Sequence, residues 1–338
     1  MRTLEELDNA LYKISDELID DMKRLDGDII ILGAGGKMGP SLARLAKLSM
    51  DAAGMNHKVI AVSRFGNKET EKELQHLGIE TISIDLIDDS SLQKLPDARN
   101  VIYMAGTKFG TTGNEHYTWA MNAYLPGMVA KKFRNSRIVV FSTGNVYPLT
   151  SVETNGPDET YPVGPIGEYA QSCLGRERIF EHFSISNQTP VLIYRLNYAI
   201  DLRYGVLLEI GKAVRVKKPI NLSMGYVNVI WQGDANQIAI RCLHHCTTPP
   251  SVLNVTGAEK VAVRWIAHEF GKLFGIEPVF ENEDQSTALL SNASRMETLF
   301  PFHKVSIDEM ILMTAEWLKQ GGSLLDKPTH FQERAGKF

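Results

Sequence analysis

Two kinds of apolar spacing alternate along most of the chain. Short unbroken apolar runs, typical of buried strands, are separated by stretches in which apolar side chains recur every three or four residues, as on one face of a helix. The expected strands are residues 28–32, 57–65, 79–86, 98–106, 136–147 and 189–197. The helices expected between them are one that begins at Pro40 and those over residues 68–78, 118–133 and 168–184. This alternation predicts β-α-β units and an α/β fold, a Rossmann-type doubly wound parallel sheet.

The pattern differs on both sides of this sheet-forming region. Residues 3–25 place leucine, isoleucine and methionine three and four positions apart, which predicts an extra N-terminal helix that packs on the body or on a second subunit. Beyond about residue 200 the alternation loosens, which predicts a smaller C-terminal substrate lobe. We expect an N-terminal amphipathic helix (1–26), a dinucleotide-binding domain (27–198, with 227–257 returning to it) and a substrate-binding lobe (199–226 and 258–330).

Composition and charge narrow the functional class. The 338 residues carry a formal net charge of -4, so we expect no excess positive charge that would bind nucleic acid. No apolar run approaches the ~20 residues that cross a bilayer, so no membrane partner is expected. Acidic residues interrupt the leucines near the N-terminus, unlike a secretory signal, and three cysteines cannot build a disulfide framework. We therefore expect a cytoplasmic protein whose partner is a small-molecule substrate.

Glycines recur every third residue directly after the first expected strand. They are Gly33, Gly36 and Gly39, with Gly35 as an addition, and Pro40 then opens a helix. Such a turn seats a diphosphate, because the backbone bends tightly and no side chain blocks the approach of the phosphates. The following helix also offers free N–H groups. The stretch therefore predicts a nucleotide site.

With this turn and further motifs, the chain resembles the extended short-chain dehydrogenases/reductases, also called the NAD-dependent epimerase/dehydratase family, over about residues 28–320. The motifs are "GAGGKMG" (33–39), "IDL" (84–86), "YMAG" (103–106), Asn122, "STGNVY" (142–147), "RLN" (195–197) and "VNVIWQGDAN" (227–236). The resemblance implies a NAD or NADP cofactor. The cofactor contacts it implies are Gly33, Gly35, Gly36, Lys37, Met38, Gly39, Ser63, Arg64, Asp85, Leu86, Met104, Ala105, Gly106, Asn122 and Asn197.

The choice between NAD and NADP depends on the end of the second strand. NAD sites usually present an acidic side chain there, which accepts a hydrogen bond from the ribose 2′-OH. This chain has Ser63 and Arg64 instead, and an arginine pairs well with a 2′-phosphate. The pattern favours NADP, the alternative being that Arg64 is a solvated loop residue.

The resemblance also implies a catalytic group. In this family a tyrosine exchanges a proton with the substrate oxygen during hydride transfer, a serine or threonine hydrogen-bonds that oxygen, and a lysine one helical turn after the tyrosine lowers its pKa. By motif position the acid/base is Tyr169, its hydroxyl partner is Thr143 or the neighbouring Ser142, and the lysine's position holds Cys173. A neutral thiol cannot stabilise a phenolate. Arg176 lies about 10 Å further along the helix axis than Tyr169, so we do not expect direct contact.

Three interpretations follow from the missing lysine. The first is an NAD(P)-dependent oxidoreductase or epimerase/dehydratase, acting on a polar, sugar-like or nucleotide-sugar substrate as the resemblance implies. The second is an NAD(P)-binding protein with little turnover, acting as a sensor or interaction partner. The third uses Cys173 as a nucleophile, although a buried helical cysteine is usually inert. The presence of both Thr143 and Tyr169 favours the enzyme, and family members often pair as homodimers.

Substrate contacts should come from the later part of the chain. The candidates by chemistry and position are Tyr147, Arg203, Trp231 and Arg264. The cluster "CLHHC" at residues 242–246 contains residue types that bind metal ions, but a closed zinc site takes four ligands, usually from two separated pairs. Because no second pair is evident, we expect no metal site.

Overall fold

The central feature of the computed structural model, which describes residues 3–325, 327 and 329–338, is one sheet of seven parallel strands. Their spatial order is β12-β7-β5-β4-β1-β2-β3, so the chain reverses direction across the sheet between β1 and β4. This confirms the predicted doubly wound α/β fold. The strands are β1 (Ile29–Leu32), β2 (Val59–Ser63), β3 (Glu80–Ser83), β4 (Asn100–Tyr103), β5 (Arg137–Thr143), β7 (Val191–Leu196) and β12 (Ser251–Val255).

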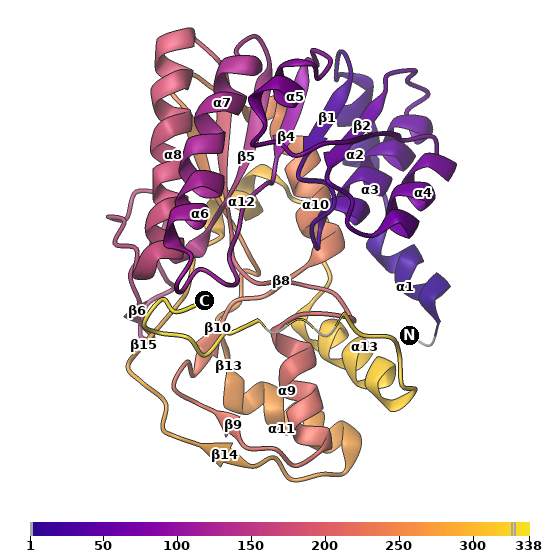
Figure 1. The fold of residues 1–338 in the computed structure, drawn as a ribbon. Coiled ribbons are helices and arrows are strands. Elements are labelled where there is room, and N and C mark those ends of the chain that lie inside the picture. The colour runs from indigo at the N-terminus through magenta and orange to yellow at the C-terminus, as the bar shows by residue number, and fades with distance from the viewer. Residues whose placement is uncertain (1–2, 326, 328) are drawn as a thin grey trace.

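Helices cover both faces of the sheet (Figure 1). Side chains alternate between the faces, so Ile29 and Ile31 join one buried core while Ile30 and Leu32 join the other. Around the first core lie α2 (Asp16–Lys23), α3 (Gly39–Ala52), α4 (Lys68–His76), α10 (Gln232–Arg241) and α12 (Ser294–Leu299). Around the second lie α5 (Asp89–Gln93), a π-helical turn (Ala120–Tyr124), α7 (Leu125–Lys132) and α8 (Gly167–Asn187). A short helix, α6 (Glu115–Trp119), leads into the π-helical turn.

A smaller lobe with its own apolar core lies below the carboxyl ends of the strands (Figure 1). Its helices are α9 (Val206–Arg215), α11 (Val263–Phe274) and α13 (Ile307–Lys319). Short strand pairs surround them: β8 (Ala199–Ile200) with β11 (Ile230–Trp231), β9 (Ile220–Asn221) with β14 (Phe280–Glu281), β10 (Tyr226–Val227) with β13 (Val261–Ala262), and β6 (Thr150–Ser151) with β15 (Thr287–Ala288).

The N-terminal amphipathic stretch forms two helices, not the single helix expected over residues 3–25. They are α1 (Leu4–Leu11) and α2, and the side chain of Ser15 accepts a hydrogen bond from the Leu18 N–H to cap the second. Because the break lets each helix turn independently, Leu7 and Leu11 enter the lobe core while Leu18 enters the sheet core. The segment thereby joins the two parts of the molecule.

Residues 329–338, here named the closing segment, run from the lobe back to the sheet domain (Figure 1). Glu209 on α9 accepts hydrogen bonds from the backbone N–H and hydroxyl of Thr329. The Arg334 guanidinium donates to the Thr287 carbonyl and hydroxyl. At the far end, the Phe338 carbonyl accepts from the N–H groups of the Thr111–Thr112 pair. The closing segment is therefore anchored on both sides of the space between the lobe and the sheet.

Candidate active site

The glycine turn is packed so closely that side chains are excluded at three of its four glycines, Gly33, Gly35 and Gly39. Gly33 has a φ of +93°, and a Cβ there would lie 2.6 Å from the Ala105 nitrogen. A Cβ on Gly39 would lie 2.3 Å from the Ala34 carbonyl oxygen. Gly36 differs, because a Cβ there would meet only one atom, the Gly33 oxygen at 3.4 Å. Gly36 thus presents bare backbone to a cavity.

This catalytic cavity has a volume of about 430 Å³ and lies at the carboxyl ends of β1, β4, β5 and β7. It brings together ten of the residues singled out from the sequence: Gly33, Gly36, Lys37, Met38, Met104, Gly106, Ser142, Thr143, Tyr169 and Asn197. The Asn197 side-chain nitrogen is buried there and has no hydrogen-bond partner in the described part of the chain. An orphaned donor and a bare glycine backbone are the features that a bound polar ligand would complete.

Tyr169 and Thr143 meet in this cavity. Tyr169 is in the first turn of α8 and Thr143 ends β5, and both side chains line the cavity, where the Thr143 hydroxyl lies close enough to lower the pKa of Tyr169. Burial raises the pKa of Tyr169 well above its usual value, and the neighbouring Cys173 raises it further. The positive charge of Arg176 and the hydrogen bond from Thr143 act in the opposite direction. At neutral pH the phenol is therefore protonated and ready to donate.

Ser142 lies next to Thr143 but has a different partner. Its hydroxyl donates to a Glu177 carboxylate oxygen at 2.5 Å, and the same carboxylate forms a buried two-point ion pair with Arg195, with N···O distances of 3.0 and 2.7 Å. Both charged side chains are about 5 % exposed. Ser142 is thus bound into a structural network, and Thr143 is the hydroxyl that lowers the pKa of Tyr169.

Cys173 and Asn122 occupy the space behind Tyr169. The Asn122 side-chain nitrogen donates to the Thr107 carbonyl and the Ser172 hydroxyl and lies 4.0 Å from the Cys173 sulfur. Its oxygen accepts from the Arg176 guanidinium at 2.8 Å. Burial raises the pKa of the Cys173 thiol, so the residue is an uncharged thiol at neutral pH.

Arg176 is the buried cation of this region. It has no hydrogen bond to Tyr169, as the helical spacing predicts, but its guanidinium reaches the Phe141 carbonyl at 2.7 Å, and its charge lowers the pKa of Tyr169. A Cβ on Gly106 would lie 2.3 Å from this guanidinium. The glycine after β4 is therefore required by the arginine beneath it.

A neighbouring hollow is lined by one of the residues expected near the adenosine end of the cofactor, while Ser63, Arg64, Asp85 and Leu86 are not part of its lining. Gly35 lines it, and a Cβ on Gly35 would meet the Ser63 hydroxyl at 2.4 Å. Arg64 is exposed and lies 3.8 Å from the Asp85 carboxylate. Because the arginine faces an acidic side chain at this place, the geometry gives no preference for a 2′-phosphate. Leu86 and Ala105 are buried in the core that supports the strands.

The structure corrects the choice of substrate contacts. None of the four candidates lines the catalytic cavity. Trp231 is buried in the lobe and donates to the Ala10 carbonyl, and Tyr147 is buried and bonds Asn254. Arg203 pairs with Asp201, and Arg264 pairs with Asp284 on the lobe surface. Their sequence context places them in the right segments, but tertiary contacts satisfy each of them elsewhere.

Several cavity residues were missed by the sequence analysis. The largest group is basic or aromatic: Lys108, Phe109, Tyr204 and Lys327. Lys108 follows the "YMAG" motif by two positions, so it could have been found there. Phe338, whose ring lies 5.4 Å from that of Tyr169, is 169 residues further along the chain, and no local pattern connects the two.

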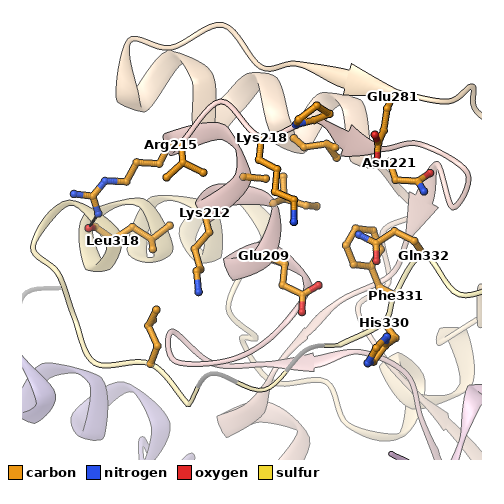
Figure 2. A pocket seen from close by; sticks show the side chains of 16 residues that line it. Glu209, Lys212, Arg215, Lys218, Asn221, Glu281, Leu318, His330, Phe331 and Gln332 are labelled. Carbon is orange, nitrogen blue, oxygen red and sulfur yellow. Dashed lines mark hydrogen bonds between the residues drawn. The ribbon is translucent and has the colours of Figure 1, made fainter. Parts of the chain in front are cut away.

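A larger hollow of about 740 Å³ lies on the lobe, away from the glycine turn (Figure 2). Figure 2 shows Arg215 reaching the Leu318 carbonyl at one edge of this hollow, with Lys212, Lys218 and Glu209 along its length. It contains none of the residues assigned to the cofactor or to catalysis. We therefore place the candidate active site in the smaller cavity, where the tyrosine and the glycine turn meet.

A metal-binding cluster and a membrane-spanning helix are both absent from the described residues. In residues 3–325, 327 and 329–338, no three His, Cys, Asp or Glu side chains converge to hold a metal ion. Within the same ranges no helix has the length and apolar character needed to cross a membrane.

Comparison with known proteins agrees with this geometry. A model of the NAD dependent epimerase/dehydratase family matches residues 29–199. UDP-glucuronic acid 4-epimerase from Bacillus cereus, solved with UDP-glucuronic acid and NAD, has a similar fold with a TM-score of 0.70 at 17% identity, covering 87% of this chain and 99% of that one.

Two more solved structures share the fold. UDP-glucose 4-epimerase from Thermotoga maritima, solved with UDP-glucose, gives a TM-score of 0.70 at 14% identity, with coverage of 87% and 99%. MoeE5, solved with UDP-glucose and NAD, gives a TM-score of 0.68 at 16% identity, and the alignment again covers 87% of this chain and 99% of that one. A comparison with curated protein sequences found no match.

Proposed function

The chain belongs to the NAD dependent epimerase/dehydratase family, and from this premise we propose that it is an NAD(P)-dependent oxidoreductase or epimerase/dehydratase with Tyr169 as its acid/base. The observation that carries the proposal is that the side chains of Tyr169 and Thr143 line one cavity, which begins at the glycine turn. A protein that only bound a dinucleotide would need neither hydroxyl there.

The residues present fit a dinucleotide. The backbone of Gly36 and the N-terminus of α3 would hold the diphosphate, and Asn197, with its unpaired side-chain nitrogen, lies in the same cavity. When bound, the nicotinamide supplies or accepts a hydride. The sheet edge where Arg64 faces Asp85 would hold the adenosine ribose. Two proteins of similar fold, MoeE5 and the Bacillus cereus epimerase, were crystallised with NAD.

The protonation state of Tyr169 supports one direction of proton transfer. Because burial raises its pKa, the hydroxyl carries its proton at neutral pH and can donate it to a developing alkoxide. Thr143 would hold the same substrate oxygen through its hydroxyl. Removing a proton from the substrate first requires the phenolate, of which a free phenol with a pKa near 10 offers only about one part in a thousand at pH 7. The site therefore favours reduction of a carbonyl group.

The substrate class rests on the fold comparison. The solved structures named above bind UDP-sugars, and this likeness supports a polar, sugar-like or nucleotide-sugar substrate. A cytoplasmic location and a homodimer stay predictions.

Cofactor binding tests the proposal without knowledge of the substrate. We expect NADH or NADPH to change its nicotinamide fluorescence when titrated with the protein. Gly36→Val should weaken this binding at least tenfold, because its side chain would project into the cavity. Gly127→Ala on α7 is the matched control, since its new Cβ would make only ordinary contacts, the nearest at 3.6 Å. A flat titration with both cofactors would refute the proposal.

A further inference from the structure

The catalytic cavity is lined by positive charge. Three lysines reach it: Lys37 from the glycine turn, Lys108 from the loop after β4, and Lys327 just before the closing segment. None of the described residues that line it is an aspartate or glutamate. Three like charges in one half-enclosed cavity repel each other, and an anionic ligand would relieve that repulsion.

The ammonium groups of two of these lysines lie over aromatic rings. The Lys37 ammonium lies 3.6 Å from the centre of the Tyr204 ring, and the Lys108 ammonium lies 4.3 Å from the centre of the Phe338 ring. Neither has a hydrogen-bond or ion-pair partner within the part of the chain that the structure describes. Burial lowers the pKa of Lys37 to about 7 and that of Lys108 to about 8. Such desolvated, unpaired ammonium groups indicate a ligand that is still to be supplied.

The two ammonium groups serve different parts of the cavity. Lys37 is within the glycine turn, where the diphosphate of the cofactor would lie. Lys108 is beside the reacting hydroxyls, with its ammonium 5.5 Å from the centre of the Tyr169 ring. An anionic group that contacts Lys108 would therefore belong to the substrate.

The closing segment limits the length of that substrate. The Phe338 ring meets the Tyr169 ring edge-on at 5.4 Å, and the Phe338 carbonyl is fixed by the Thr111 and Thr112 N–H groups. Gly336 is pressed against α8, where a Cβ would lie 2.2 Å from the Ile166 oxygen.

Little room is left on the far side of the closing segment. The hollow that remains there, lined by Asn145 and Leu289 among others, measures about 20 Å³, room for about one water. The catalytic cavity itself, at about 430 Å³, is near the lower end for ligand sites and would also hold the nicotinamide. A nucleotide attached to the substrate on this side would have to displace Phe338.

We propose that the substrate is a small carbonyl or hydroxyl compound that carries a carboxylate or phosphate group, that Lys108 binds this group, and that the closing segment excludes nucleotide sugars. The proposal rests on the proposed function, since it places the reacting carbon beside Tyr169. It separates this chain from the solved structures of the same fold that bind UDP-sugars.

The test uses the full chain saturated with NADH and reads nicotinamide fluorescence on titration with oxalate, inorganic phosphate or UDP-glucose. We expect oxalate, phosphate or both to bind, the stronger one identifying the anionic group, and UDP-glucose neither to bind nor to compete. Lys108→Met should weaken anion binding at least tenfold and Lys108→Arg should restore most of it, because charge at this place is what matters. Lys131→Met, an exposed lysine on α7, is the matched control and should change nothing.

A second variant tests the closing segment. Gly336→Val places atoms against the Ile166 carbonyl and should dislodge the segment, so UDP-glucose binding should appear. Binding of UDP-glucose by the unaltered chain, equal anion binding by Lys108→Met, or no gain in Gly336→Val would each overturn the proposal. Absence of NADH binding would instead refute the proposed function, so the two failures can be told apart.

Discussion

The buried ion pair behind the active site offers a sharp test of how the catalytic strands are held. Glu177 on α8 joins Arg195 on β7 and Ser142 on β5, so one carboxylate ties together the three elements that carry or flank Tyr169 and Thr143. The Arg195 guanidinium also donates to the Tyr147 hydroxyl at 2.7 Å. Replacing Glu177 with alanine would leave a buried guanidinium without its counter-charge.

The expected loss of stability in Glu177→Ala follows from this geometry. Breaking a buried pair by removing one partner costs about 3–5 kcal/mol, and the stranded Ser142 hydroxyl adds about 1 kcal/mol. For a chain of this size that corresponds to a fall in Tm on the order of 6–10 °C.

Urea unfolding followed by circular dichroism measures this change in the free energy of unfolding. The matched control is Glu181→Ala, which breaks an exposed pair with Arg178 on the same helix and should cost about 0–1 kcal/mol. Glu177→Leu combined with Arg195→Met removes both charges and should recover most of the stability. If Glu177→Ala and Glu181→Ala lose the same amount, the ion pair does not hold these elements together.

Three further predictions concern charge. Cys173→Lys places a cation one turn after Tyr169 and should lower the pKa of Tyr169 by about 1–3 units. The shift is measured by phenolate absorbance, with Tyr169→Phe identifying the signal of Tyr169. The neutral control Cys173→Met should not lower the pKa, and equal titration curves for the two Cys173 variants would refute the electrostatic account. Oxalate or phosphate binding should weaken as pH rises through about 8, because Lys108 then loses its charge. The groups near the Lys108 ammonium are Cys173 and Tyr169 on α8, Glu209 on α9 and Lys37. Lys108→Arg should make anion binding independent of pH in this range. Burial raises the pKa of Asp234 to about 6, above its unfolded value, so its contribution to stability is fully present below about pH 4 and lost as pH rises through 6. Asp234→Asn should remove that slope from urea unfolding curves, and an unchanged slope would contradict it.

The sequence by itself determined the order of strands and helices and the position of the glycine turn. Both are local properties: an unbroken apolar run indicates a buried strand, apolar spacing of three and four residues indicates a helix, and the glycines from Gly33 onward mark the tight turn. The pairing of Thr143 with Tyr169 was an expectation from the family resemblance alone, because Tyr169 lies in the first turn of α8 and not at the end of a strand.

Tertiary structure decided which polar groups remained available to a ligand. Ser142, Tyr147 and Trp231 have the right chemistry for a site, yet each is satisfied by a partner far away in the chain: Glu177, Asn254 and Ala10. Local periodicity carries no record of such pairs, because they form only when segments that are distant in the sequence pack together. For the same reason the closing segment, which brings the Phe338 ring against Tyr169 and Lys108, could be seen only in the folded chain.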